Sequence, residues 1–363
     1  MIFVNSMIQS ISLDSRIRAF VELGKVMGQA AESYTLPDNG FAIQYPELYN
    51  SLQIAFHQNP WFIPVNIAFA LNEWKTALKE DAIKSWLNSY KPDIQKTISK
   101  KVAVTMAGNI PLVGFHDFLC TLICGHSFIG KLSSTDKVLL PAIANILCTI
   151  EPSFRQKIQF TEGTIQDFDA IIATGSNNTA RYFEYYFSKH PHIIRKNRNG
   201  VAVLNGNEDA AALKRLGSDI CTYFGLGCRN VSKIFLPEGF NPQKLYSAVE
   251  PFNKILFHHF KYMNNHSYHR SIYLLNNIPF LDNDAFILTE SEQYSSPIPV
   301  LYYEFYMKIE SLKEKLFKDD ERIQCIATDV FTSKNTVPLG LTQSPGLADY
   351  ADGIDTLKFL IEL

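Results

Sequence analysis

Cys228 lies in a sequence that suits nucleophilic chemistry. It stands in the segment Gly-Leu-Gly-Cys-Arg-Asn at positions 225–230. Flanking glycines let a backbone approach a ligand closely, and the positive charges of Arg229 and Lys233 favour the thiolate, the nucleophilic form of cysteine. The segment is expected to be a loop between a helix and a strand, from which the sulfur can face a cleft. Four other cysteines lie on apolar segments that predict buried helical faces: Cys120, Cys124, Cys148 and Cys221.

Other chemical motifs are weaker. Gly125 to Lys131 has the spacing of a phosphate-binding loop, but Leu132 stands where such a loop needs a hydroxyl group for magnesium. Neither a Cys-x-x-Cys pair nor a His-Glu-x-x-His motif occurs, so we predict no metal site. His116 and Asp117 stand at the start of an expected helix, which we expect them to cap.

The composition is that of a globular protein. Of 363 residues, 46% are hydrophobic and 19% are charged. The 34 Lys and Arg residues and 36 Asp and Glu residues give a net charge of −2, so no broad positive field for a nucleic acid is expected. The longest stretch without charge, 48–72, carries amides and two prolines, which predicts no membrane span. The first residues lack the pattern of a secretory signal and cysteines are few, so the expected compartment is the cytoplasm.

The spacing of apolar residues predicts an α/β protein that begins with helices. Apolar residues at Ile17, Phe20 and Leu23 recur at helical spacing, and so do those of 82–90. After them, strand and helix patterns alternate, which predicts mostly parallel sheets covered by helices. The expected strands are 101–106, 128–132, 169–173, 200–206 and 232–237, and the expected helices are 115–125, 136–149, 179–187 and 208–224. A hydroxyl residue in 133–135 is expected to cap the second of these helices.

Several segments, in the same order, resemble the aldehyde dehydrogenase superfamily. Met-Ala-Gly-Asn-Ile-Pro at 106–111, followed by an apolar helix and a strand that ends at Lys131, resembles its strand–Asn–Pro–helix–strand–Lys segment. Thr-Gly-Ser at 174–176 resembles its second nucleotide loop, and 225–237 resembles its cysteine loop. More closely, 108–119, 130–136 and 344–360 are similar to the long-chain acyl-CoA reductase family (LuxC-like), bacterial enzymes that make fatty aldehydes.

The resemblance implies a fold and a set of roles. The implied fold is an aldehyde-dehydrogenase-like α/β fold: two parallel-sheet domains with a cleft between them and a helical N-terminal segment. The implied domains are 1–198 (helical segment and nucleotide-binding domain), 199–345 (catalytic domain) and 346–363 (a segment that returns to the core). Cys228 matches the nucleophile, and Asn109 matches the asparagine whose amide donates to the oxyanion. The remaining matches concern the cofactor: Lys131 beside the adenosine ribose, Thr174, Gly175 and Ser176 beside the phosphates, and Glu292 as the nearest counterpart of a ribose-binding glutamate.

Two departures from the family pattern refine this picture. Where many NAD-using relatives carry a glutamate, this chain has Ser134, which together with Ser133 and Lys131 offers donors to a 2′-phosphate. We therefore expect NADPH as the reductant. Where hydrolytic relatives carry a glutamate general base, 194–198 contains no carboxylate, so an acyl-enzyme would not be hydrolysed.

These residues predict the reduction of an acyl thioester to an aldehyde through an acyl-cysteine. The expected donor is acyl-CoA or an acylated protein, and the chain is expected to form a homo-oligomer or a complex with an acyl-transfer partner. Two alternatives remain open. One is an acyltransferase or thioesterase that pairs Cys228 with His116 or His126. The other is a non-catalytic, nucleotide-binding partner in an acyl-transfer complex.

Overall fold

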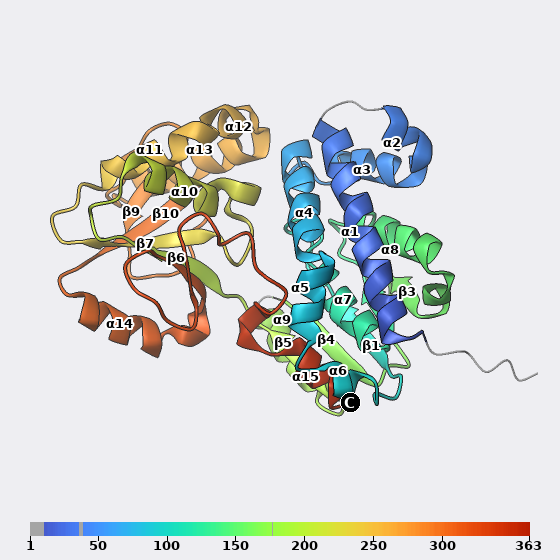
Figure 1. The fold of residues 1–363 in the computed structure, drawn as a ribbon. Helices are drawn as coiled ribbons and strands as arrows, with labels where there is room; N and C mark the ends of the chain where they lie inside the picture. Colours follow the sequence, from blue (N-terminus) through green and yellow to red (C-terminus); the bar gives the residue numbers. More distant parts are fainter. Residues whose placement is uncertain (1–10, 36–38, 176) are drawn as a thin grey trace, which may run out of the picture. The chain divides into compact units, whose positions relative to one another are not determined.

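The chain folds into two units (Figure 1). The structure, a computed structural model, describes residues 11–35, 39–175 and 177–363. The first unit runs to Arg195 and also includes Gly346–Leu363, whereas the second comprises Lys196–Pro345. None of the described helices is both long enough and apolar enough to cross a membrane.

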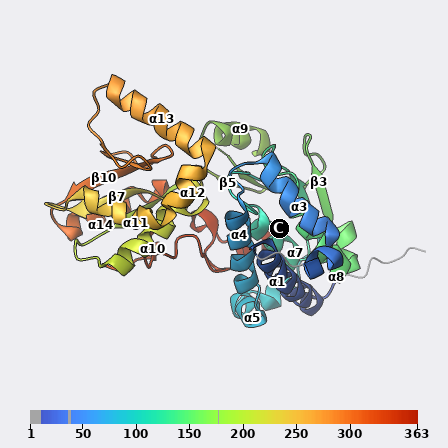
Figure 2. The ribbon, with the colours of Figure 1, turned by 90° about the horizontal axis from the view of Figure 1, so that it is seen from above.

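Helices open the first unit, as expected. α1 (Leu13–Thr35) lies beside α4 (Pro64–Ala77) in both views (Figures 1 and 2). Along α1, Phe20, Leu23 and Met27 are fully buried, so one face of the helix forms part of the core. The other helices of this segment are α2 (Asn39–Gln44), α3 (Pro46–Gln58), α5 (Glu80–Leu87) and α6 (Lys91–Ile94).

A five-stranded parallel sheet follows, in the order β3-β2-β1-β4-β5. Its strands are β1 (Lys101–Thr105), β2 (Ser127–Lys131), β3 (Ile158–Thr161), β4 (Ala170–Thr174) and β5 (His192–Arg195). The strand order changes direction between β1 and β4, which are neighbours. Open sheets of this kind bind ligands beyond the carboxyl ends of the two strands at such a switch point.

Helices cover both faces of this sheet. The side chains of β1 alternate: Val102 and Val104 join the large core formed with α7 (Phe115–Ile123) and α8 (Leu139–Ile150). Ala103 instead packs against Phe183 and Phe187 of α9 (Asn177–Phe187). A strand with both faces buried in this way is typical of a parallel sheet.

The segment 346–363 is tied into the first unit by buried polar contacts. Arg195 at the end of β5 donates to both carboxylate oxygens of Asp117, at 2.6 and 2.8 Å, and also to Thr356 Oγ1 at 3.2 Å. Thr356 begins α15 (Thr356–Ile361), which follows the 3-10 turn η6 (Ala351–Gly353). The expectation that Asp117 caps α7 is therefore wrong, because its carboxylate is used by Arg195, and Gly114 stands at the N-cap.

The second unit contains a seven-stranded sheet in the order β12-β11-β6-β7-β10-β9-β8. Its strands are β6 (Asn199–Val203), β7 (Val231–Pro237), β8 (Leu281–Asp282), β9 (Ile287–Glu290), β10 (Val300–Tyr306), β11 (Ile323–Ala327) and β12 (Thr336–Val337). All neighbours are parallel except β8 and β9. The sheet is therefore mixed rather than wholly parallel, since the short connection between β8 and β9 permits only an antiparallel pair.

Helices also cover both faces of the second sheet (Figure 1). α10 (Ala210–Cys221), α11 (Tyr246–Val249), α12 (Asn253–His258) and α13 (Phe260–Leu275) lie on one side, and α14 (Ile309–Lys318) lies on the other. Leu312 and Leu316 of α14 pack on Val201 and Phe235 of the sheet. The 3-10 turns of this unit are η2 (Thr222–Gly225), η3 (Pro242–Leu245), η4 (Glu250–Phe252) and η5 (Asp320–Arg322).

Candidate active site

Cys228 occupies a tight turn that leads into β7. The backbone N–H of Asn230 donates to the carbonyl of Gly227 at 3.0 Å, and the N–H of Gly227 donates back to Asn230 Oδ1 at 2.8 Å. Cys228 and Arg229 are the two middle residues of this turn. Cys228 is exposed, whereas the other five cysteines are buried. The turn therefore presents the one accessible thiol among the described residues.

Asn230 anchors this turn to the end of α10. Its side chain is 2% exposed and donates to the carbonyls of Thr222 at 2.8 Å and Asp219 at 3.0 Å. Arg229, which lies between Cys228 and Asn230, is held separately, because its Nε donates to the carbonyl of Thr342 at 2.6 Å. The turn is thus held by the two residues that follow Cys228. The sequence shows an asparagine two residues after the cysteine. Its position alone does not predict that its side chain binds the carbonyls of Asp219 and Thr222.

The chain reaches the turn through a reversal that was not expected. The predicted helix 208–224 ends at Cys221, and Tyr223 and Phe224 both adopt left-handed backbone conformations, with φ of 55° and 58°. Such conformations cost of order 1–3 kcal/mol each in a residue with a side chain, so surrounding contacts must hold them. Both side chains are buried, and the Phe224 ring centroid lies 4.2 Å from that of His259. Gly225, with φ of 78°, completes the reversal.

We expect Asn230→Ala to loosen the cysteine turn. The change leaves buried carbonyls of Asp219 and Thr222 without their donor, so the free energy of unfolding should fall by about 2–3 kcal/mol, as measured by urea denaturation. The rate of Cys228 alkylation by iodoacetamide should change as well. Asn230→Asp is the matched variant, because it keeps the acceptor for Gly227 but loses every hydrogen bond that the amide donates. If both variants unfold and alkylate like the wild type, the anchoring role is wrong.

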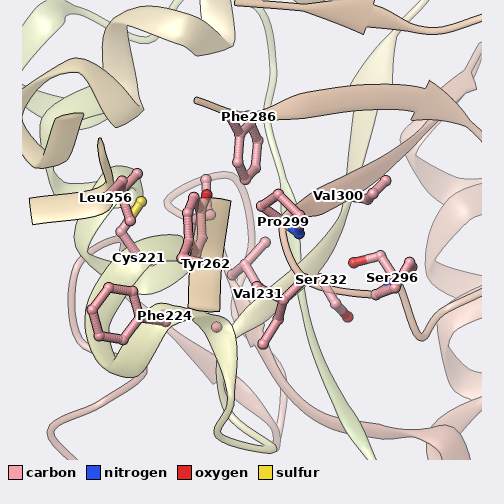
Figure 3. Close-up of a pocket in the computed structure, with 14 residues that line it drawn as sticks. Cys221, Phe224, Val231, Ser232, Leu256, Tyr262, Phe286, Ser296, Pro299 and Val300 are labelled. Atoms are coloured by element: carbon pink, nitrogen blue, oxygen red, sulfur yellow. The ribbon is translucent and has the colours of Figure 1, made fainter. Parts of the chain in front are cut away.

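A small cavity, lined by both apolar and polar groups, is formed by residues that come before and after the turn in the chain (Figure 3). Its volume is about 30 Å³, which is enough to hold a water molecule. Leu256, Cys221 and Phe224 lie on one side of it, and Ser296 and Val300 lie on the other (Figure 3). The cavity is formed by residues that come shortly before and after the cysteine turn, among them Gly225 and Val231.

Burial keeps several of the other thiols protonated. It raises the pKa of Cys124 to about 12, and it also raises the pKa values of Cys120, Cys148 and Cys221. A thiol with a raised pKa is a poor nucleophile near neutral pH. These four cysteines are therefore core residues, as their apolar helical faces predicted.

In the first unit, the loop after β1 carries Asn109 and contacts the loop after β2. The carbonyl of Gly108 accepts from Thr135 Oγ1 at 2.8 Å and from Asn59 Nδ2 at 3.4 Å. A Cβ atom on Gly108 would lie 2.5 Å from Thr135 Oγ1 and 2.6 Å from Ser133 Oγ, so only glycine permits this approach. The half-buried Asn109 is therefore placed next to the residues predicted to bind the adenosine ribose.

The residues after β2 form a turn rather than the predicted helix start. Ser133 Oγ lies 3.0 Å from Thr135 Oγ1, and Ser134 is exposed. α8 begins at Leu139 instead of Asp136, because the hydroxyl groups expected to cap it contact each other and Gly108 instead. Asp136 accepts from the Leu139 N–H at 3.3 Å, and burial raises its pKa to about 6. The Asp136 carboxyl group points at the start of α8. It therefore does not take the place of the glutamate that many NAD-using relatives carry at the position of Ser134.

The other predicted cofactor residues lie in two places. Thr174 ends β4 beside β1, and the N–H of Gly175 donates to the carbonyl of Arg195 at 3.3 Å. Ser176 lies outside the described residues. Glu292 is exposed and follows the carboxyl end of β9, whereas Cys228 precedes the amino end of β7. The first unit thus places Lys131, Ser133, Ser134, Thr174 and Gly175 at the carboxyl ends of β2 and β4, the two strands that flank β1, and such a set fits a nucleotide.

The two histidines considered as general bases have other partners. His126 is 1% exposed, accepts from the Lys100 N–H through Nδ1 at 3.1 Å, and donates through Nε2 to the Leu360 carbonyl at 2.8 Å. Both of its ring nitrogens are therefore used. His116 Nε2 lies 2.9 Å from the carbonyl of Leu347, and its ring faces Cys120 Sγ at 3.9 Å. Burial lowers the pKa of both rings.

The histidines of 258–269 likewise have separate partners. His266 Nε2 lies 2.9 Å from Asp282 Oδ1, and His259 Nδ1 accepts from the Tyr262 N–H at 3.1 Å at the start of α13. Among the residues that the structure describes, no three His, Cys, Asp or Glu side chains come together in a way that could hold a metal ion.

Comparison with known proteins finds a match to one family model and a shared fold with solved structures. A model of the acyl-CoA reductase (LuxC) family matches residues 75–249, slightly less than half of the chain. The match confirms the resemblance to the LuxC-like acyl-CoA reductases. It spans both Asn109 and Cys228. Comparison with curated protein sequences gave no match.

Solved structures of aldehyde dehydrogenases share the fold of this chain. Aldehyde dehydrogenase 21 from Physcomitrella patens is 12% identical, with a TM-score of 0.62 over 96% of this chain and 87% of that one. An aldehyde dehydrogenase from Bacillus cereus is also 12% identical, with a TM-score of 0.60 over 90% and 73% of the two chains. An indole-3-acetaldehyde dehydrogenase in complex with NAD⁺ is 12% identical, with a TM-score of 0.60 over 85% of this chain and 71% of that one.

These similarities confirm the predicted fold class, an aldehyde-dehydrogenase-like α/β fold, with the mixed second sheet as the one difference. At such low identity they establish the fold alone. Together with the LuxC family match, they support an oxidoreductase that acts on acyl or aldehyde groups.

Proposed function

We propose that the protein reduces a fatty acyl-CoA, or a related acyl thioester, to the fatty aldehyde with NADPH, through an acyl group held on Cys228. One observation carries this proposal: the only accessible thiol among the described cysteines stands on an anchored turn within the segment that matches the LuxC family. The other described cysteines are buried, so acyl transfer to any of them would require local unfolding.

The chemistry follows from an accessible thiolate. The Cys228 sulfur attacks the thioester carbonyl carbon, the carbon–sulfur bond to coenzyme A breaks, and coenzyme A leaves as a thiol after it takes up a proton. Donors for the transient oxyanion are the Cys228 backbone N–H and, by the family motif, the Asn109 amide. A reduced nicotinamide, when bound, supplies the hydride that converts the acyl group to an aldehyde.

The lack of a carboxylate in 194–198 and the contacts of His116 and His126 support reduction over hydrolysis. The segment 194–198, where hydrolytic relatives carry a glutamate, contains no carboxylate, and Arg195 is bound to Asp117. Since His126 uses both ring nitrogens and His116 contacts Leu347 and Cys120, neither is available to activate a water molecule at Cys228. An acyl group on Cys228 therefore persists until hydride arrives.

Two features of the first unit support a dinucleotide cofactor. The switch point between β1 and β4 is where parallel sheets bind nucleotides, and the proposed cofactor residues lie at the carboxyl ends of β4 and of β2, the strands on the two sides of β1. Lys131 offers an ammonium group to the ribose, while Ser133 and Ser134 offer hydroxyl donors to a 2′-phosphate. We propose Thr174, Gly175 and Ser176 for the phosphates. Glu292 is proposed as a ribose contact on the resemblance alone.

The test is to incubate the protein with NADPH and a panel of acyl-CoAs of different chain length, with absorbance followed at the nicotinamide band and the product identified by mass. Aldehyde formed with equal consumption of NADPH supports the proposal. Free acid formed without NADPH consumption would instead favour the thioesterase. The same panel in the presence of an acylated carrier protein decides which donor is used.

We expect Ser134→Glu to shift the preference from NADPH towards NADH. A carboxylate at this exposed position repels a 2′-phosphate by roughly 1–2 kcal/mol, which corresponds to an about 5- to 30-fold change in the ratio of specificity constants. Ser134→Gln is the matched control, since it adds the same bulk without charge, and it should leave the ratio nearly unchanged. Equal specificity constants for the two cofactors in the wild type would rule the assignment out.

A further inference from the structure

A polar cavity lies at the amino ends of the strands in the first unit's sheet, whereas the proposed cofactor residues lie at the carboxyl ends. It has a volume of about 310 Å³, within the range of small-molecule sites. Ser99, His126 and Lys157, which line it, come shortly before β1, β2 and β3, so they gather at the amino ends of these strands. The amino and carboxyl ends of a five-residue strand lie roughly 16 Å apart. The cavity is therefore distinct from the proposed cofactor site.

Arg16 is a buried charge in the wall of this cavity. It is 6% exposed, and one of its Nη atoms donates to the carbonyl of Ile123 at 2.6 Å. Its Nε is buried and has no hydrogen-bond partner. No carboxylate forms an ion pair with Arg16 within the described part of the chain. A buried guanidinium without a counter-charge is costly, and an anion would offset this cost.

Lys157 adds a second cation to the same cavity. Its ammonium group donates to Ser99 Oγ at 2.7 Å and to the carbonyl of Gly125 at 3.2 Å, and neither partner carries a charge. Burial, followed by the positive charge of Arg16, lowers the pKa of Lys157. Such a shift is expected where two cations lie near each other without an anion between them.

The carboxylates near the cavity do not neutralise these cations. Asp14 lines it, but its side chain is 70% exposed and lies 3.9 Å from Lys91. Asp169 accepts from the Lys101 N–H at 2.7 Å. Residues 1–10 contain no acidic side chain, so they supply no counter-charge either.

The glycine between α7 and β2 keeps room for the guanidinium. Gly125 has φ of 87°, and a Cβ atom there would lie 2.6 Å from a terminal nitrogen of Arg16. Any other residue would therefore be strained and would displace Arg16. Gly125 therefore leaves room for the Arg16 guanidinium in the wall of the cavity.

From these contacts we infer that the cavity binds a phosphate-type dianion, held by Arg16 and Lys157 with help from the Ser99 hydroxyl. Arginine pairs with two phosphate oxygens at once, and lysine contributes a point charge. The occupant is a small phosphate compound, either inorganic phosphate or a phosphomonoester, since both present the same group. This site is independent of the proposed reductase activity.

The test is calorimetric titration of the full chain with inorganic phosphate, and in a second arm with phenyl phosphate, with ionic strength held constant by sodium chloride. We expect saturable binding that weakens about tenfold or more in Lys157→Met, through loss of a charge-assisted contact. Tighter binding of phenyl phosphate identifies a phosphomonoester as the ligand class, and tighter binding of inorganic phosphate identifies the free ion; either supports the site.

Two controls separate this site from other phosphate contacts. Lys25→Met removes the same charge from the exposed face of α1 and should bind phosphate like the wild type. Lys131→Met alters the proposed cofactor site and should also keep the affinity. Arg16→Met should abolish binding, and if that variant does not fold, Lys157→Met decides, because Lys157 is only half-buried. Absence of saturable binding in the wild type, or unchanged affinity in Lys157→Met, overturns the inference.

Discussion

Replacement of Cys228 by alanine is expected to abolish turnover and acylation together. Without the Cys228 sulfur there is no accessible nucleophile among the described cysteines, since the other five are buried and the pKa values of four of them are raised. The measurement is intact mass after incubation with acyl-CoA in the absence of NADPH. The wild type should gain the mass of one acyl group, and Cys228→Ala should gain none.

Cys148→Ala is the matched control for this experiment. It removes another thiol, 8% exposed, from α8 in the first unit, and it should keep both the acyl adduct and turnover. A stable acyl adduct on Cys228→Ala protein would show that another residue is the nucleophile. A folded Cys228→Ala protein that still oxidises NADPH with acyl-CoA would also rule the assignment out.

The second large effect is expected at Asn109. Loss of one oxyanion donor typically lowers the turnover number by ~10²- to 10³-fold, because the donated bond is strongest in the transition state. Asn109→Ala should therefore lower kcat by this amount and leave KM nearly unchanged. The fold should survive, since Asn109 is half-buried in the loop after β1.

Asn109→Asp provides a sharper version of the same test. It keeps the size of the side chain, removes the amide donor and adds a negative charge, so it should lower kcat at least as much as alanine. Circular dichroism and the melting temperature must match the wild type in both variants. A raised KM with an unchanged kcat would show that Asn109 binds the substrate rather than the transition state.

The central strands could be predicted from sequence because burial on both faces leaves an unmistakable apolar pattern. β1, β2, β4 and β7 lie within one residue of their expected positions, and β6 ends three residues earlier than expected. β3 and β5 were missed, since each has four residues and lies at an edge of the sheet, where exposed polar residues interrupt the pattern. The start of α8 was misplaced because its expected caps, in 133–135, are used in a contact with Gly108 that local sequence does not reveal.

Sequence was enough to propose the residues of the candidate site, which stay predictions, but it did not show what supports the cysteine turn. Glycines around Cys228 and nearby positive charge indicated a nucleophile, and the family resemblance supplied Asn109 and the cofactor residues. What sequence could not show is how the turn is held. Asn230 reaches back to Asp219 and Thr222, and Arg229 reaches Thr342, more than a hundred residues away. Contacts at such separations depend on the whole fold and leave no local pattern.

The return of 346–363 to the first unit has a consequence for biosynthesis. Arg195 contacts Thr356, Tyr90 donates to Asp355 and His126 contacts Leu360, across separations of 161, 265 and 234 residues. A ribosome must therefore translate the entire second unit before the first can close its core. Domains fold as they emerge during synthesis, so the second unit can fold while the first still waits for its last helix. Until then the part of the first unit's core that Leu357 and Leu360 cover stays exposed to solvent.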